Sequence, residues 1–120
     1  MKAELSKTFR FEAGHRLPHV APEHRCARPH GHSYAATITV CGEIDKQAGW
    51  VMDFGRIKKV VEPVVQQLDH HNLNEVDGLA NPTSENIALW LWQRIKPNLP
   101  ELSAIAVDES DTSRCTYRGE

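Results

Sequence analysis

The spacing of apolar residues changes twice along this chain, and that change restricts the fold more than any other feature. In four segments apolar and polar residues alternate, as in strands that bury one face: residues 5–15, 30–41, 103–109 and 113–117. Between the second and third of these, apolar residues recur every three or four positions, as along one face of a helix, over residues 53–68 and 83–95. The order of elements is therefore ββααββ.

This order predicts an α+β fold in which two helices cover one face of a four-stranded antiparallel sheet. Because no helix remains for the other face, that face is left to water or to a partner subunit. Edge strands also need cover, so we expect the chain to oligomerise.

Capping residues and prolines set the expected limits of the helices. Asp53 is a suitable N-cap for the first helix, because its carboxylate can accept from a free backbone N–H group. Pro63 lies on the polar side of that helix and is expected to kink it rather than end it. The second helix is expected to begin near Thr83 or Ser84 and to stop before Pro97.

The composition excludes several classes of protein. Lys plus Arg is 14 and Asp plus Glu is 16, which gives a net charge of −2, and no basic run is present. Binding to nucleic acid through its phosphates is therefore not expected. No run approaches the ~18 consecutive apolar residues of a membrane span. The 120 residues suit one domain, over residues 1–120.

The cysteines indicate a reducing compartment. Cys26, Cys41 and Cys115 are odd in number and contain no Cys-x-x-Cys pair, so a disulfide framework is not expected. The first residues carry no apolar run suited to a signal peptide. We therefore expect a cytoplasmic protein with reduced thiols.

Three of the seven histidines lie at the facing ends of the first two predicted strands. His15 ends the first strand, and His30 and His32 begin the second, on the faces that carry the apolar residues. If the two strands pair antiparallel, all three imidazoles meet on one face. Three neutral imidazoles suit Zn²⁺ and leave a fourth position for water or substrate, although Fe²⁺ or another divalent ion fits the same ligand type. The alternative is that these are ordinary half-buried histidines.

Cys26 lies in the polar loop that joins these strands, between Arg25 and Arg28. A thiol beside cations and a metal ion forms a thiolate more readily, and a thiolate can act as base or nucleophile. The alternative is a small buried filler, which is the interpretation we prefer for Cys41 and Cys115.

Carboxylates mark two further candidate positions. Asp69 precedes His70 at the end of the first helix, and such a pair can carry out general acid–base catalysis; capping of the helix end is the alternative. Glu109 ends an inward-facing apolar row, where a ligand with paired N–H donors would satisfy its carboxylate. A solvated strand end is the alternative for Glu109.

Together these residues resemble the 6-pyruvoyl-tetrahydropterin synthase family, and more closely its 6-carboxy-5,6,7,8-tetrahydropterin synthase branch in queuosine biosynthesis. The resemblance covers essentially the whole chain, and the spacing of Cys26 from the His-Gly-His motif fits the carboxy branch. The motifs that carry it occur in this order: His15, Cys26, His30-Gly31-His32, Leu68-Asp69-His70, Pro82-Thr83-Ser84-Glu85-Asn86, Glu109 and Tyr117-Arg118-Gly119-Glu120.

The resemblance implies a tunnelling fold (T-fold), in which three subunits form a barrel and two trimers stack into a homohexamer. It implies a lyase reaction in which 7,8-dihydroneopterin triphosphate gives 6-carboxy-5,6,7,8-tetrahydropterin, acetaldehyde and triphosphate. The active sites lie between subunits. The implied roles are zinc ligation by His15, His30 and His32, proton acceptance by Cys26, a catalytic relay through Asp69 and His70, and anchoring of the pterin ring by Glu109.

Two other functions remain as alternatives. One is the pyruvoyl reaction on the same substrate, in which the side chain is retained rather than cleaved. The other is a non-catalytic metal- or pterin-binding module on the same fold.

Overall fold

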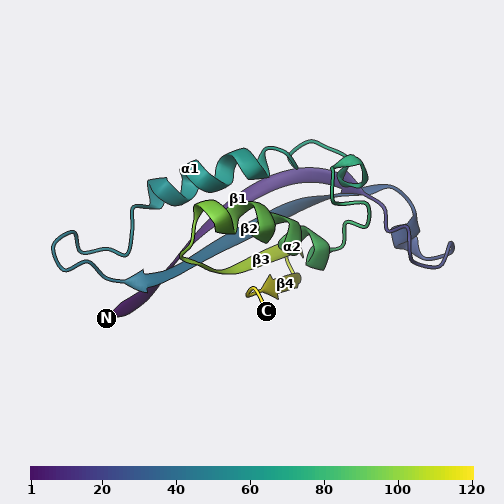
Figure 1. Ribbon diagram of the computed structural model, residues 1–120. Helices are drawn as coiled ribbons and strands as arrows, with labels where there is room; N and C mark the ends of the chain where they lie inside the picture. Colours follow the sequence, from purple (N-terminus) through teal and green to yellow (C-terminus); the bar gives the residue numbers. More distant parts are fainter.

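The structure, a computed structural model, describes residues 1–120, and its elements follow the predicted order (Figure 1). The strands and helices are β1 (Lys2–His15), β2 (His30–Glu43), α1 (Phe54–Val65), α2 (Ser84–Ile95), β3 (Leu102–Ser110) and β4 (Ser113–Tyr117). Short 3₁₀ turns add η1 (Arg25–Ala27), η2 (Leu73–Glu75) and η3 (Lys96–Asn98).

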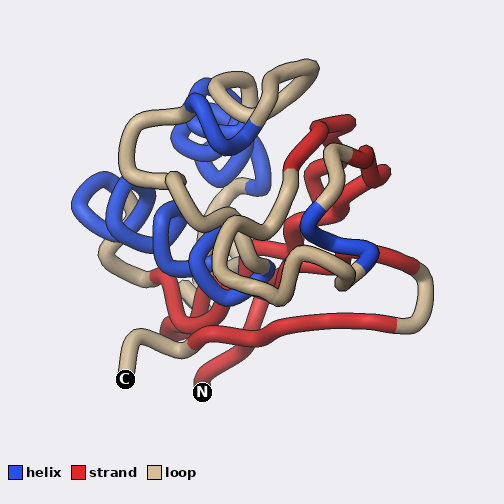
Figure 2. The backbone as a smooth tube through the Cα atoms, turned by 90° about the vertical axis from the view of Figure 1, so that its right-hand side faces the viewer, coloured by secondary structure: helices blue, strands red, loops and turns tan.

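The strands form one antiparallel sheet in the order β1-β2-β3-β4, as predicted. Pairing of β1 with β2 runs from Lys2 opposite Glu43 to His15 opposite His30. This long hairpin follows the length of the molecule, whose principal extents are 58 × 23 × 22 Å. Both helices lie on the same side of the sheet (Figures 1 and 2), which confirms the predicted layering.

Helix α1 is capped as predicted but ends early. The Asp53 carboxylate accepts from the Gly55 N–H at 2.8 Å. The predicted helix continued to residue 68, whereas α1 ends at Val65. Pro63 lies inside the helix but cannot donate a backbone hydrogen bond. After Val65 the hydrogen bonding tightens, since the Leu68 N–H donates to the carbonyl of Val65, three residues earlier, at 2.9 Å. The helix therefore closes in a tight turn.

Helix α2 begins as predicted, because the Thr83 hydroxyl accepts from the Asn86 N–H at 3.1 Å. Its apolar face and that of α1 pack on the sheet, where Phe11 and Tyr34 stack with ring centroids 4.9 Å apart. No helix is both long and apolar enough to cross a membrane.

The opposite face of the sheet is polar. Hydroxyl groups pair across β1 and β2, with Ser6 Oγ 2.8 Å from Thr39 Oγ1 and Thr8 Oγ1 3.1 Å from Thr37 Oγ1. These short polar side chains keep the surface flat and hydrogen-bonded without a covering helix.

Candidate active site

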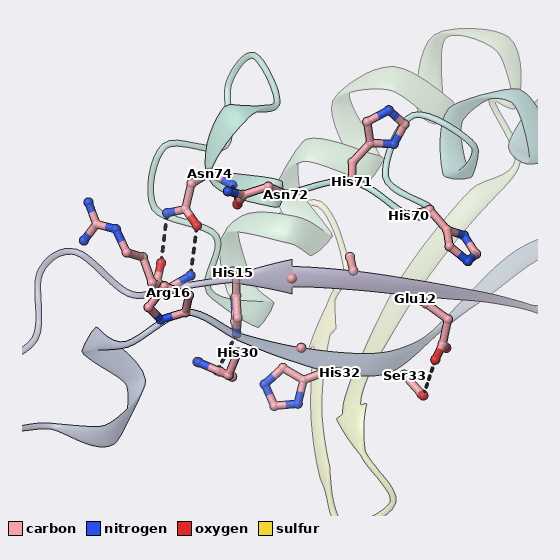
Figure 3. A pocket seen from close by; sticks show the side chains of 14 residues that line it. Glu12, His15, Arg16, His30, His32, Ser33, His70, His71, Asn72 and Asn74 are labelled. Atoms are coloured by element: carbon pink, nitrogen blue, oxygen red, sulfur yellow. Dashed lines mark hydrogen bonds between the residues drawn. The ribbon is translucent and has the colours of Figure 1, made fainter.

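Three histidines meet where β1 ends and β2 begins. His15 lies opposite His30, and Ala13 lies opposite His32, so all three imidazoles project from the same face. Their ligand atoms lie within 4.8 Å of one another, and the Nε2 atoms of His15 and His30 are 3.0 Å apart. Figure 3 shows the three rings gathered on one side of β1. The strand pairing thus brings together the residues that the sequence pattern placed in register.

The hydrogen bonds of these rings leave their Nε2 lone pairs free. His15 donates from Nδ1 to the Pro82 carbonyl at 2.8 Å, and His30 donates from Nδ1 to the Arg28 carbonyl at 2.7 Å. A neutral imidazole with Nδ1–H carries its lone pair on Nε2, so two lone pairs face each other. Nε2 of His32 is buried and has no hydrogen-bond partner. A cation among the three Nε2 atoms satisfies all of them, and the donor set therefore fits a metal ion.

Burial favours the neutral form of His15 and His32. Desolvation lowers the pKa of both His15 and His32, and the nearby His30 adds to the effect on each. The Glu109 carboxylate acts in the opposite direction. Its Oε1 lies 3.6 Å from His15 Nε2 and 3.7 Å from His32 Nε2. Neutral imidazole is the form that binds metal, so the site is suited to a cation near neutral pH.

A cavity of about 720 Å³ opens beside the histidines and is lined by 14 residues, of which one is hydrophobic. They come from the end of β1 with the following Arg16, from Pro29 and the start of β2, and from the segment 70–74. Its volume suits a small polar ligand.

Asn74, which no sequence pattern singled out, helps to shape this cavity. Asn74 accepts from the Arg16 N–H through Oδ1 and donates to the Arg16 carbonyl through Nδ2, both at 2.9 Å. This amide therefore continues the strand pairing just beyond β1 and fixes the backbone next to His15 (Figure 3). An isolated asparagine in a polar segment carries no sequence signal for such a long-range contact.

Cys26 lies in η1, half-buried, and does not line the cavity. Its N–H donates to His24 Nδ1 at 3.0 Å, and its carbonyl accepts from the Leu17 N–H at 2.7 Å. The loop is therefore held by its own hydrogen bonds, with the thiol outside the cavity wall.

Asp69 and His70 form a dyad that the edge of β1 fixes. Asp69 Oδ1 lies 3.0 Å from His70 Nδ1 and accepts from the Glu12 N–H at 2.9 Å. The Glu12 carbonyl accepts the His70 N–H, at 2.6 Å. The Glu12 N–H is the main reason that the pKa of Asp69 falls below its usual value. The carboxylate thus lies beside the His70 ring as an acceptor, although the ring is 77% exposed.

Within one chain His70 lines the same cavity as the three histidines, whereas Asp69 does not line it. Figure 3 shows His70 and His71 on one side of β1, with His30 and His32 on the other. His70 has a left-handed backbone, with φ of 60°, which is costly for a residue with a Cβ. The two groups of predicted residues therefore come together in one chain only in part.

Comparison with known proteins agrees with these motifs. The family model described as 6-pyruvoyl tetrahydropterin synthase matches residues 4–120. The chain belongs to this family. The structure of 6-pyruvoyl tetrahydropterin synthase from Caenorhabditis elegans superposes with a TM-score of 0.91 at 26% identity, covering 100% of this chain and 97% of that one. This agreement confirms the predicted T-fold of the subunit.

Members of the 6-pyruvoyl tetrahydropterin synthase family that resemble this chain carry different names. A 6-carboxy-5,6,7,8-tetrahydropterin synthase of Synechocystis is 40% identical over 119 residues, covering 94% of this chain and 91% of the relative. A dihydroneopterin monophosphate aldolase of Pyrococcus furiosus is 46% identical over 100 residues, covering 83% and 81%. These relatives share the family but are named for different reactions.

Proposed function

We propose that this protein is a zinc-dependent lyase that converts 7,8-dihydroneopterin triphosphate to 6-carboxy-5,6,7,8-tetrahydropterin, acetaldehyde and triphosphate, a reaction of queuosine biosynthesis. The observation that carries the proposal is the convergence of His15, His30 and His32 with their Nε2 atoms free. Similarity to the Synechocystis synthase over almost the whole chain supports the choice of reaction.

The three histidines would hold Zn²⁺ through Nε2. When bound, the ion supplies Lewis-acid polarisation of the substrate side chain, which makes loss of a C–H proton easier. His15 and His30 are already fixed in the tautomer that this requires, because backbone carbonyls accept their Nδ1–H groups.

Glu109 would anchor the pterin ring. Its side chain is 32% exposed and its Oε1 lies no closer than 3.6 Å to a histidine nitrogen, so its oxygens remain able to accept from a ligand. The guanidine-like edge of a pterin offers two parallel N–H groups, which match a carboxylate. This contact would set the orientation of the ring relative to the histidines.

Proton transfer is assigned to Cys26 and to the Asp69–His70 dyad. Cys26 would accept the proton that the substrate loses, and His70, held by Asp69, would return a proton elsewhere. Because Cys26 and Asp69 lie outside the cavity that the three histidines line, we propose that neighbouring subunits complete each site. A cytoplasmic homohexamer of single-domain subunits, built as a dimer of trimers, meets this requirement.

An aldolase reaction is the second candidate, and similarity to the Pyrococcus furiosus enzyme at 46% identity favours it. Cleavage of a dihydroneopterin monophosphate between the first two side-chain carbons also needs a base and a polarised hydroxyl. The same histidines and proton carriers could therefore serve it. The pyruvoyl reaction and a non-catalytic binding module remain further alternatives.

Product analysis separates these functions. Zinc-loaded protein is incubated with dihydroneopterin triphosphate and, in parallel, with the monophosphate. We expect acetaldehyde and a 6-carboxypterin from the triphosphate. A retained pyruvoyl side chain would indicate the synthase of that name, and a two-carbon aldehyde phosphate from the monophosphate would indicate the aldolase. Absence of turnover with both substrates, while zinc stays bound, would favour the binding module.

A further inference from the structure

The turn that precedes α2 contacts the candidate metal centre through a single backbone atom. The Pro82 carbonyl accepts the Nδ1–H of His15 at 2.8 Å, and both residues are buried. The motif from Pro82 to Asn86 therefore reaches the metal centre, although none of its side chains lines the cavity.

The side chain of Asn86 holds this turn in place. Its Nδ2 donates to the Asn81 carbonyl at 2.8 Å, and the Thr83 N–H donates to the same carbonyl at 2.9 Å. Pro82 lies between these two anchored residues, so the direction of its carbonyl is fixed on both sides. Capping of α2 does not need this contact, because the Thr83 hydroxyl already accepts from the Asn86 N–H.

Apart from the Pro82 carbonyl, no neighbour of His15 favours the tautomer that carries its proton on Nδ1. The Tyr34 hydroxyl lies 3.3 Å from His15 Nδ1 and 3.4 Å from Nε2, so it does not distinguish the two nitrogens. Nε2 of His30, at 3.0 Å, would favour the opposite tautomer, in which His15 donates from Nε2. Only the Pro82 carbonyl keeps the proton on Nδ1.

We propose that Asn86 is a positioning residue for the metal ligand His15. By anchoring the Asn81 carbonyl it holds the Pro82 carbonyl against His15 Nδ1, which keeps the Nε2 lone pair directed at the metal. Partners of metal-bound histidines affect metal affinity through this kind of orientation. The inference rests on the proposed role of His15 as a ligand, and it is independent of which reaction the site performs.

The test is Asn86→Asp, which has the same shape but cannot donate to the Asn81 carbonyl. A carboxylate in the first turn of α2 is favourable to the helix, so the fold should be kept. We expect zinc affinity, measured by competition with a chromophoric chelator, to fall about tenfold. Nitrogen NMR of the metal-free protein should show that part of His15 has moved to the Nε2–H tautomer.

Asp53→Ala is the matched control, because it removes the cap of the remote helix α1. It should lower stability while zinc affinity and the His15 tautomer stay unchanged. If Asn86→Asp has the zinc affinity and the His15 tautomer of the unmodified protein, the proposal is wrong. If the unmodified protein binds no zinc, the proposed metal site fails, whereas the tautomer comparison still tests Asn86.

A measurement without substitution covers the case in which Asn86→Asp does not fold. Zinc loading should slow hydrogen exchange of the Asn86 side-chain amide, because metal and hydrogen bond stabilise the same arrangement. The exposed side-chain amide of Asn98 serves as the reference and should not change. Equal effects of zinc on both amides would overturn the proposal.

Discussion

Nε2 of His15 faces Nε2 of His30 at 3.0 Å, while both Nδ1–H groups are bonded to backbone carbonyls. Two lone pairs in this position repel each other, and a cation between them removes the repulsion. We therefore expect zinc to raise the thermal unfolding midpoint. At 100 times Kd a ligand contributes about 2.7 kcal/mol to the free energy of unfolding.

The variant His30→Ala should lose this response to zinc, whereas His19→Ala, in the exposed part of the loop before β2, should keep it. Thermal unfolding with zinc and with a chelator measures both. An equal zinc response in His30→Ala would show that the ion binds elsewhere.

Acid should destabilise the metal-free protein before carboxylates titrate. Burial places the pKa of His15 and of His32 below the value of about 6.5 that each has when unfolded. The unfolded chain therefore takes up protons first as the pH falls. Their contribution to stability is complete above about pH 6.5 and is lost as the pH falls toward the folded pKa values.

Urea denaturation at a series of pH values between 7.5 and 5 would check this, and His32→Asn should flatten the dependence. The exposed His19→Asn should leave it unchanged. A free energy of unfolding that does not vary over this range would contradict the pKa directions.

Local sequence patterns were enough to predict the sheet and the meeting of three histidines. Alternation sets the face of each residue, and antiparallel pairing then places His15 opposite His30. The exact end of α1 was not predicted, because it depends on turns that follow Val65 and not on the apolar stripe, which continues to the buried Leu68.

The side-chain-to-backbone contacts between distant segments could not be predicted from the sequence. Asn74 reaches Arg16, and Glu12 contacts both Asp69 and His70, through backbone groups that every residue possesses. Since the pairing partner of a backbone N–H is not encoded by residue type, such contacts carry no local pattern. The same holds for the Pro82 carbonyl beside His15.

His70 has a proposed catalytic role and a backbone conformation that is unfavourable for a residue with a Cβ. The effect on turnover and the effect on stability can be measured separately. A positive φ costs a residue with a Cβ about 1 kcal/mol relative to glycine. We expect His70→Gly to be at least as stable as the unmodified protein while turnover falls by about 100-fold or more. Chemical denaturation and product formation measure the two quantities.

His71→Gly is the control for this experiment, because His71 does not have a positive φ. It should lose about 0.5–1 kcal/mol through the greater freedom of glycine in the unfolded chain. If both glycine variants lose the same stability, the left-handed backbone of His70 carries no strain.

Cys26 and Cys41 are both half-buried, yet only Cys26 lies in the loop that joins the strands of the candidate metal site. Loss of the proton acceptor should reduce turnover by about 10²–10⁴-fold in Cys26→Ala. Zinc content should remain that of the unmodified protein, because the thiol is not among the proposed ligands. Cys41→Ala should keep nearly full turnover, and equal activity of both variants would remove Cys26 from the mechanism.

Glu109 lies close enough to the histidines to affect either the metal or the substrate, and a single variant distinguishes these roles. If its carboxylate anchors the pterin, Glu109→Gln loses a charged hydrogen bond worth about 1.5–3 kcal/mol, and KM should rise by about 10- to 100-fold. Zinc affinity should then change little. Glu4→Gln makes the same charge change on β1, where the side chain is exposed, and should alter neither quantity. A large loss of zinc affinity with unchanged KM would instead assign Glu109 to the metal, since its Oε1 lies 3.6 Å from His15 Nε2.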